Sequence, residues 1–107
     1  MDVLFEDDAL KELYEHQQTS DRKYKKLVRN KGFVYAYVQI INVMRAADKT
    51  SDLRTFSFLH YERLKHRHES SVRIQNGRVE RLIFTEHNDG IEIRLIEIDS
   101  NHYGNKR

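Results

Sequence analysis

Two dipeptides that favour tight turns, Asn76-Gly77 and Asp89-Gly90, divide the second half of the chain into short segments. Asn-Gly and Asp-Gly are strong hairpin signals because the preferred two-residue turns require positive φ angles. The segments on either side alternate between apolar and polar residues, as half-buried strands do. The sequence therefore predicts a meander of antiparallel strands at 70–74, 79–86 and 91–98, and residues 59–65 are expected to form a further strand before it.

The first half of the chain has helical spacing in place of alternation. A short strand is expected at 3–5, after which Asp7 or Asp8 offers a carboxylate that can cap a helix. A second cap is expected within 19–21, and a broad apolar stripe then runs from there to Met44. Gly32 interrupts this stripe and predicts a kink or break, because glycine costs up to about 1 kcal/mol in a helix relative to alanine.

Helices followed by a meander predict an α+β fold, in which an N-terminal strand and the helices pack on one face of a twisted antiparallel sheet. The chain has 107 residues, which predicts a single domain spanning 1–107. It has no cysteine, which excludes disulfides, thiolate metal sites and a cysteine nucleophile. No apolar run approaches the roughly 18 residues of a membrane span, and residues 1–6 do not resemble a signal peptide. A cytoplasmic protein without a membrane partner is expected.

The net charge is only +2, but basic residues concentrate in 22–31 and 63–73. Within the second region, Arg73 stands between Val72 and Ile74, so alternation directs its side chain away from the core that these two residues enter. The same argument predicts a sheet with one apolar face and one cationic face. A cationic face without a compact carboxylate cluster suits a phosphodiester backbone better than a neutral metabolite.

The register of the first hairpin decides whether Arg73 and Arg81 share that face. A tight turn centred on Asn76-Gly77 would place Val72 opposite Arg81 and would put the two arginines on opposite faces. Hydrophobic pairing favours the other register, in which Val72 and Ile74 pair with Leu82 and Phe84. We therefore predict that the two arginines lie together, which requires an odd-residue loop or a bulge within 76–80.

The order of these segments resembles a known family. The resemblance covers essentially the whole chain and rests on the order and spacing of short motifs, namely Leu64-Lys65, Ser71-Val72-Arg73-Ile74, Arg81-Leu82-Ile83-Phe84 and Asn101-His102-Tyr103. The chain resembles the RelE/ParE superfamily of bacterial toxins and is most similar to its HigB-like branch. The resemblance implies a RelE-like fold and a type II toxin that cleaves messenger RNA within the ribosome. It also implies a neutralising antitoxin protein, usually with a helix-turn-helix domain.

Metal-free RNA cleavage needs a base for the 2′-hydroxyl, positive charge at the phosphate and an acid for the leaving 5′-oxygen. Arg73 and Arg81 match the cationic strand residues of the family, and guanidinium suits bidentate phosphate contacts. Lys65 matches the family lysine, although His66 replaces the glycine that follows it. His102 and Tyr103 resemble the terminal tyrosine and histidine of the family in reversed order. Either of these two can be the acid or the base, and no cofactor is expected.

His60 can match a family histidine upstream of the lysine if the interval between the two residues is longer here. An alignment without a gap would place Glu62 at that position instead. Further RNA contacts are expected from Arg63, Arg67, Lys25 and Arg29. Lys25 and Arg29 belong to the basic run 22–31, which could also be a solvated helix face without a binding role.

Three alternatives remain open on the sequence. His66 and His68 have the alternate spacing that could bind zinc, with a third ligand from Glu69, His87 or His102. The sheet could serve as a non-enzymatic inhibitor of DNA gyrase, as in ParE-like relatives. The chain could also be a catalytically inactive module that binds only its antitoxin.

Overall fold

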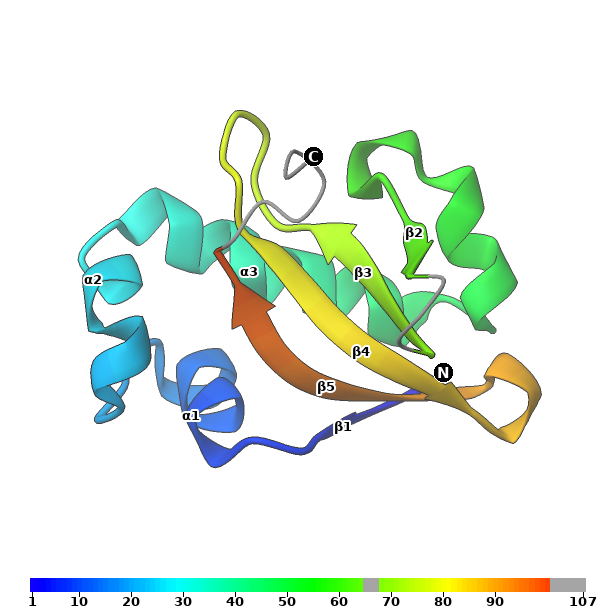
Figure 1. Ribbon diagram of the computed structural model, residues 1–107, viewed down its shortest axis with the longest axis horizontal. Helices are drawn as coiled ribbons and strands as arrows, with labels where there is room; N and C mark the ends of the chain where they lie inside the picture. Colours follow the sequence, from blue (N-terminus) through cyan, green and yellow to red (C-terminus); the bar gives the residue numbers. More distant parts are fainter. Residues whose placement is uncertain (65–67, 101–107) are drawn as a thin grey trace.

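The computed structural model describes residues 1–64 and 68–100. Helices come first and most of the sheet follows, so the predicted α+β class is confirmed (Figure 1). The α-helices are α1 (Asp8–His16), α2 (Lys25–Val28) and α3 (Lys31–Ala46). The strands are β1 (Asp2–Phe5), β2 (Glu62–Leu64), β3 (Glu69–Arg73), β4 (Arg81–His87) and β5 (Glu92–Asp99). Short 3-10 helices complete the fold: η1 (Arg22–Tyr24), η2 (Thr50–Thr55), η3 (Ser57–Leu59) and η4 (Asn88–Gly90).

The five strands form one sheet in the order β1-β5-β4-β3-β2. The pairs β2–β3, β3–β4 and β4–β5 are antiparallel, as the meander predicts. Strand β1 instead pairs with β5 in parallel, with Val3 opposite Ile93. The expectation of a purely antiparallel sheet was therefore wrong, because alternation shows which residues face a core but not which strand lies alongside.

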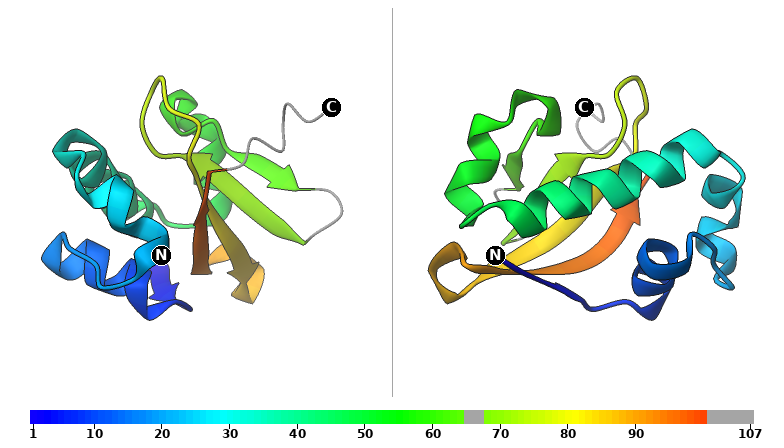
Figure 2. Two further views of the ribbon diagram at one scale, coloured as in Figure 1. Left: turned by 60° about the vertical axis from the view of Figure 1, so that its left-hand side comes forward. Right: turned by 180° about the vertical axis from the view of Figure 1, so that it is seen from behind.

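The helices cover one face of the twisted sheet, and the other face is not covered by any described helix (Figure 2). The core lies between these layers and is built from residues at helical spacing and from one alternating set on the strands. Its members include Leu10, Leu13, Phe33, Tyr37, Ile41, Met44, Val72, Leu82, Phe84, Ile93 and Leu95. Within the described ranges, no helix has the length and apolar character to cross a membrane.

Side-chain caps set where the helices begin. Asp7 Oδ1 accepts a hydrogen bond from Ala9 N at 2.7 Å, which identifies Asp7 as the predicted cap of α1. Asn30 Oδ1 accepts from Phe33 N at 3.0 Å and starts α3. The predicted break therefore lies between α2 and α3 at Asn30, whereas Gly32 lies within the first turn of α3. A capping amide satisfies exposed N–H groups and fixes the boundary more strongly than glycine does.

The second turn signal forms the turn that its sequence predicts. Asp89 and Gly90 have φ angles of 57° and 87°, and Ile91 N donates to Asn88 O at 3.2 Å. These are the features of a type I′ turn with Asp-Gly at its centre. The turn joins β4 to β5, where His87 pairs with Glu92.

The first turn signal is also a turn, but it does not close the ladder directly. Arg78 N donates to Gln75 O at 3.1 Å, and Gly77 has φ 87°. The ladder starts at the pair Arg73 and Arg81, so residues 74–80 form the odd-residue loop that hydrophobic pairing predicts. The predicted opposition of Val72 to Leu82 and of Arg73 to Arg81 is confirmed. Phe84, however, lies opposite Ser70, so the predicted pairing of Ile74 with Phe84 was wrong.

An ion pair holds this loop against the helices. Arg78 Nε and Nη2 donate to the two carboxylate oxygens of Glu80, each at 2.9 Å, and the guanidinium lies 5.4 Å from the centre of the Phe33 ring. Glu80 is only 6% exposed. Burial on its own raises the pKa of Glu80, but the hydrogen bonds from Arg78, a backbone hydrogen bond and the charge of Arg78 together outweigh burial and hold the pKa below its usual value. The ion pair therefore favours the folded state while Glu80 is ionised.

We expect Glu80→Gln to melt at a lower temperature than the parent protein at about pH 7. A depressed carboxyl pKa contributes stability above its unfolded value and loses that contribution as pH falls through its folded value. The difference between the two proteins should therefore shrink as pH falls from about 5 to about 3. Thermal melting of both proteins at several pH values measures the difference in melting temperature. A difference that does not change with pH would contradict this role of the carboxylate.

The hydroxyl of Tyr24 supports the carboxyl end of β5. Tyr24 is 1% exposed, and its hydroxyl oxygen accepts a hydrogen bond from Ile98 N at 3.2 Å. Tyr24→Phe removes this acceptor and leaves a buried N–H group without a partner, so we expect a loss of about 1–2 kcal/mol in unfolding free energy. Tyr35→Phe is the control, because Tyr35 is 68% exposed. Equal denaturation midpoints for the two variants would rule out this contribution.

Candidate functional site

Arg73 and Arg81 lie directly opposite each other on β3 and β4. Directly opposed residues of an antiparallel pair project to the same face of a sheet. That face is opposite to the core face, because Val72 and Leu82, the next opposed pair, are buried in the core. The structure thus brings the two predicted arginines together, and we call them the arginine pair.

Arg81 is held in place by the strands beside it. Its Nε donates to Ser71 Oγ at 2.8 Å, and its Nη2 donates to the backbone carbonyl of His60. Glu62 Oε1 lies 3.8 Å from Nε, and the Arg81 side chain is 19% exposed. Arg81 therefore joins β4 to β3 and to the segment that leads into β2.

Arg73 differs from Arg81 in its hydrogen bonding. Its side chain is half-buried, and its Nε is buried with no hydrogen-bond acceptor among residues 1–64 and 68–100. Two like charges directly opposed across a ladder destabilise each other. An anion between the guanidinium groups would offset this repulsion and satisfy a buried donor. The arginine pair is therefore suited to bind a phosphate.

His60 lies beside the arginine pair but not on a strand. Strand β2 begins only at Glu62, and the predicted strand at 59–65 was wrong at its start. His60 instead ends η3 in a left-handed conformation, with φ 46° and ψ 53°. The apolar residues before it explain the difference, because Leu53, Phe56 and Leu59 recur every third residue, which is the period of a 3-10 helix.

A shallow polar pocket of about 250 Å³ lies at this edge of the sheet. Its lining residues are His60, Tyr61, Glu62 and Arg81. The pocket thus includes both residues that the family match left as alternatives, His60 and Glu62. An imidazole can donate or accept a proton and a carboxylate can accept one, so both groups can move protons beside a guanidinium.

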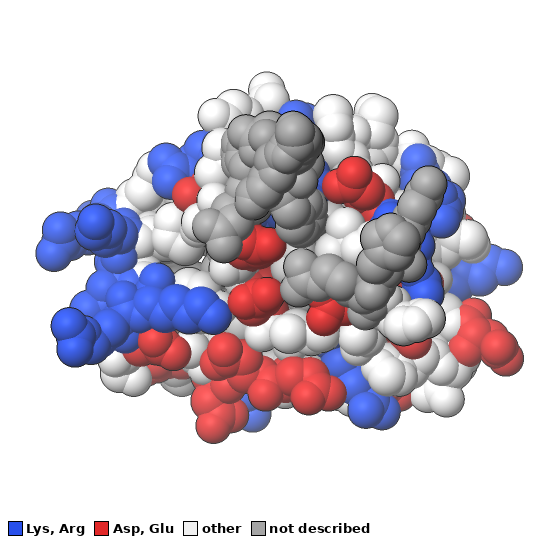
Figure 3. Space-filling model, viewed as in Figure 1, with Lys and Arg blue, Asp and Glu red and all other residues white. Residues whose placement is uncertain are grey.

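The face that carries the arginine pair is not cationic. Among the described residues it also carries carboxylates, because Asp99 pairs with Arg81, Glu62 with Ser71, and Glu97 with Ile83. Figure 3 shows acidic side chains interleaved with basic ones on this face. The prediction of a cationic face without a compact carboxylate cluster was therefore wrong. Alternation within β3 and β4 does not reveal these acidic residues, because the neighbouring strands supply them.

The remaining predicted RNA contacts do not join the arginine pair. Lys25 begins α2 and Arg29 follows it, at the opposite end of the molecule from β2 (Figure 1). Arg63 pairs with Ser70 on β2 and β3, on the other face from the arginine pair, and its Nη1 lies 3.7 Å from Glu86 Oε1. Four predicted residues lie outside the described ranges: Lys65, Arg67, His102 and Tyr103.

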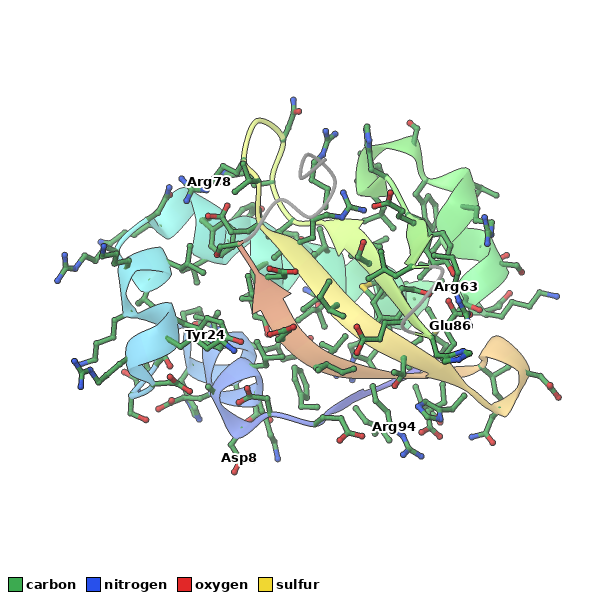
Figure 4. The ribbon with its side chains drawn as sticks, in the orientation of Figure 1. Asp8, Tyr24, Arg63, Arg78, Glu86 and Arg94 are labelled. Atoms are coloured by element: carbon green, nitrogen blue, oxygen red, sulfur yellow. The ribbon has the colours of Figure 1, made fainter. Side chains whose placement is uncertain are left out.

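A hydrogen-bonded cluster on the core side of the same edge was not predicted. Glu86 Oε2 accepts hydrogen bonds from Tyr61 Oη and, at 2.6 Å, from Ser70 Oγ. Arg63 lies beside Glu86 (Figure 4), and Arg54 stacks over the Tyr61 ring at 4.6 Å. The alternating pattern of β4 could have indicated this cluster. Glu86 is two residues after the core residue Phe84, so its carboxylate lies on the core face and needs polar partners there.

Hydrogen bonding keeps Glu86 ionised. Partial burial alone raises the pKa of Glu86, but the hydrogen bonds from Ser70 and Tyr61 hold it below the usual range. Burial, followed by the hydrogen bond to Glu86, raises the pKa of Tyr61. At neutral pH the cluster therefore joins a neutral phenol to a carboxylate, with Arg63 as the nearby cation.

No group of three or more His, Cys, Asp or Glu side chains in the described part of the chain could hold a metal ion. His66 and His102, which the zinc alternative invokes, lie outside that part. The chain matches no protein-family model and no curated protein sequence.

Proposed function

We propose that this chain is a RelE/ParE-type toxin of the HigB-like branch, which cleaves messenger RNA on the ribosome without a metal or another cofactor. The arginine pair carries the proposal. Two guanidinium groups on one sheet face, with a buried Nε that has no acceptor among the described residues, suit the crowded phosphate of a cleavage transition state. The order of strand, helices and meander is consistent with a RelE-like fold.

The proposed chemistry uses the pocket beside the arginine pair. Arg73 and Arg81 stabilise charge on the phosphate, while His60 or Glu62 takes the proton of the attacking 2′-hydroxyl. His102 and Tyr103 stay candidates for the acid that protonates the leaving 5′-oxygen. Few groups in the described site could read bases, so the ribosome is expected to position the message.

The test is primer extension on a translated message after induction of the protein. Cuts are expected at codon-related positions, and they should disappear when the start codon of that message is destroyed. A message cut equally with and without its start codon would show that the ribosome is not required. Growth arrest without any cut would favour a different target.

The proposed partner is an antitoxin protein, for which the helical layer offers a docking groove. A groove of about 620 Å³ runs beside α3, with an apolar floor and Lys31 at its margin. Its lining residues are Gln17, Val28, Lys31, Val34, Tyr35 and Val38. An apolar floor beside a lysine suits an amphipathic segment with acidic residues better than it suits RNA.

Co-expression with the neighbouring gene product should restore growth, and the two proteins should co-purify. Val38→Asp places a negative charge in the groove and is expected to weaken that complex. Val79→Asp is the matched control, because Val79 is an exposed valine in the loop between β3 and β4. Equal binding of both variants would place the partner elsewhere.

One observation favours a second function. The carboxylates beside the arginine pair reduce the attraction of this face for RNA, which suits a non-enzymatic inhibitor such as the ParE-like proteins that target DNA gyrase. Inhibition of DNA supercoiling by the purified protein, with no cleavage of translated RNA, would support this alternative.

A further inference from the structure

The Tyr61, Ser70 and Glu86 cluster lies next to the proposed RNA site but on the other face of the sheet edge. Tyr61 Oη lies 3.1 Å from Ser70 Oγ, and both hydroxyls donate to the same carboxylate oxygen of Glu86. The Tyr61 ring also packs 6.3 Å from the ring of the core residue Phe84. Tyr61 is thus fixed at its ring and at its hydroxyl.

Tyr61 is covalently flanked by the two proton-carrying candidates of the pocket, His60 and Glu62. On the open face, Arg81 donates to the backbone carbonyl of His60 and lies 3.8 Å from Glu62. Residues 60–62 are therefore held from both sides, by Glu86 through Tyr61 and by Arg81 directly.

Backbone pairing contributes little to the position of this segment. Strand β2 spans only Glu62–Leu64, and His60 and Tyr61 precede it in an irregular conformation with a positive φ at His60. A non-glycine residue in the left-handed region persists only where surrounding contacts fix it. On the core side, the Tyr61 hydroxyl contact fixes the segment after the buried core residue Leu59.

We infer that Glu86 is a positioning residue of the site, which acts through Tyr61 to hold residues 60–62 against Arg81. The expected effect on RNA cleavage rests on the proposed function. The coupling between Glu86 and Arg81 is independent of that function. Arg63 and Arg54 belong to this arrangement, since Arg63 lies 3.7 Å from Glu86 and Arg54 stacks on Tyr61. Arg63 accordingly supports the site from the core side and does not contact the RNA substrate.

The test compares Glu86→Ala, Glu86→Gln and Tyr61→Phe with the parent protein. Glu86→Ala and Tyr61→Phe should lower the single-turnover cleavage rate per folded molecule by about ten- to a hundredfold, because small displacements of reacting groups have effects of that size. Glu86→Gln keeps an oxygen that can accept from Tyr61 and should retain most of the rate. Loss of cleavage in proportion to the unfolded fraction would overturn the inference.

Glu92→Ala is the matched control. The Glu92 carboxylate accepts hydrogen bonds from Asn88 at 2.8 Å and Arg94 at 2.7 Å. The control variant therefore loses comparable contacts at a residue that does not line the pocket. Its cleavage rate should equal that of the parent protein. A drop as large as that of Glu86→Ala would mean that any lost carboxylate on the sheet has this effect.

A second readout does not depend on activity. The Nε–H of Arg81 donates to Ser71, so its nuclear magnetic resonance signal should be protected from solvent exchange. Exchange should become at least about tenfold faster in Glu86→Ala and stay unchanged in Glu92→Ala. Unchanged exchange in Glu86→Ala would refute the coupling. Absence of RNA cleavage by the parent protein would instead refute the proposed function and leave this readout decisive for the coupling.

Discussion

Arg73→Ala is expected to abolish the growth arrest that the proposed function predicts, while leaving the melting temperature close to that of the parent protein. A guanidinium contact to the transition-state phosphate is commonly worth about 3 kcal/mol, or about a hundredfold in rate. The folded state loses little, because the buried Nε of Arg73 has no acceptor among the described residues and its removal relieves the like charge opposite Arg81. Induction in growing cells, together with thermal melting of the purified protein, measures both effects.

Arg94→Ala is the control for this experiment. Arg94 is an arginine on β5 that is 40% exposed and pairs with Glu92 at 2.7 Å and Glu6 at 3.9 Å, away from the pocket. It should arrest growth like the parent protein. Continued growth arrest by Arg73→Ala at equal protein levels would remove Arg73 from the site.

Arg81→Ala should differ from Arg73→Ala in stability. Arg81 donates to Ser71 and to the His60 carbonyl, so its loss frees the segment that leads into β2. We therefore expect a lower melting temperature as well as lost growth arrest. The alternating pattern of the sequence predicts the same surface position for both arginines. It does not show that the Arg81 guanidinium is held by hydrogen bonds while that of Arg73 is less constrained.

Phe84→Ala is expected to have the largest effect on stability. Phe84 is fully buried, lies opposite Ser70 and packs on Tyr61. Removing its ring should leave a cavity and lower the unfolding free energy by about 3–5 kcal/mol. Urea denaturation measures this, and growth arrest should fall only in proportion to the folded fraction.

Phe58→Ala is the matched control, because Phe58 is 52% exposed. Its unfolding free energy should stay within about 0.5 kcal/mol of the parent value. Equal losses for the two phenylalanines would show that the core does not lie between the helices and β4.

The parts of the fold that the sequence predicted well depend on local chemistry. Asp89-Gly90 forms a type I′ turn because its residues tolerate positive φ, and Asp7 caps α1 because its carboxylate reaches Ala9 N. The opposition of Arg73 and Arg81 followed from matching apolar side chains across a hairpin. Local signals of this kind need no knowledge of distant strands.

The parts that the sequence did not predict depend on partners far along the chain. Strand β1 pairs with β5 in parallel, and no local pattern specifies that choice. The carboxylates of β2 and β5 reach the arginine face only through pairing. Glu86 was missed for the same reason, since its role depends on Tyr61 and Ser70 from two other segments.

The single-turnover rate of message cleavage on ribosomes tests the central claim most directly, with purified parent protein, Arg73→Ala and Arg94→Ala compared per folded molecule. The account predicts that Arg73→Ala is slower by about a hundredfold, while Arg94→Ala equals the parent protein. Equal rates for all three proteins, or no cleavage by the parent, would contradict the assignment of the arginine pair to phosphate chemistry.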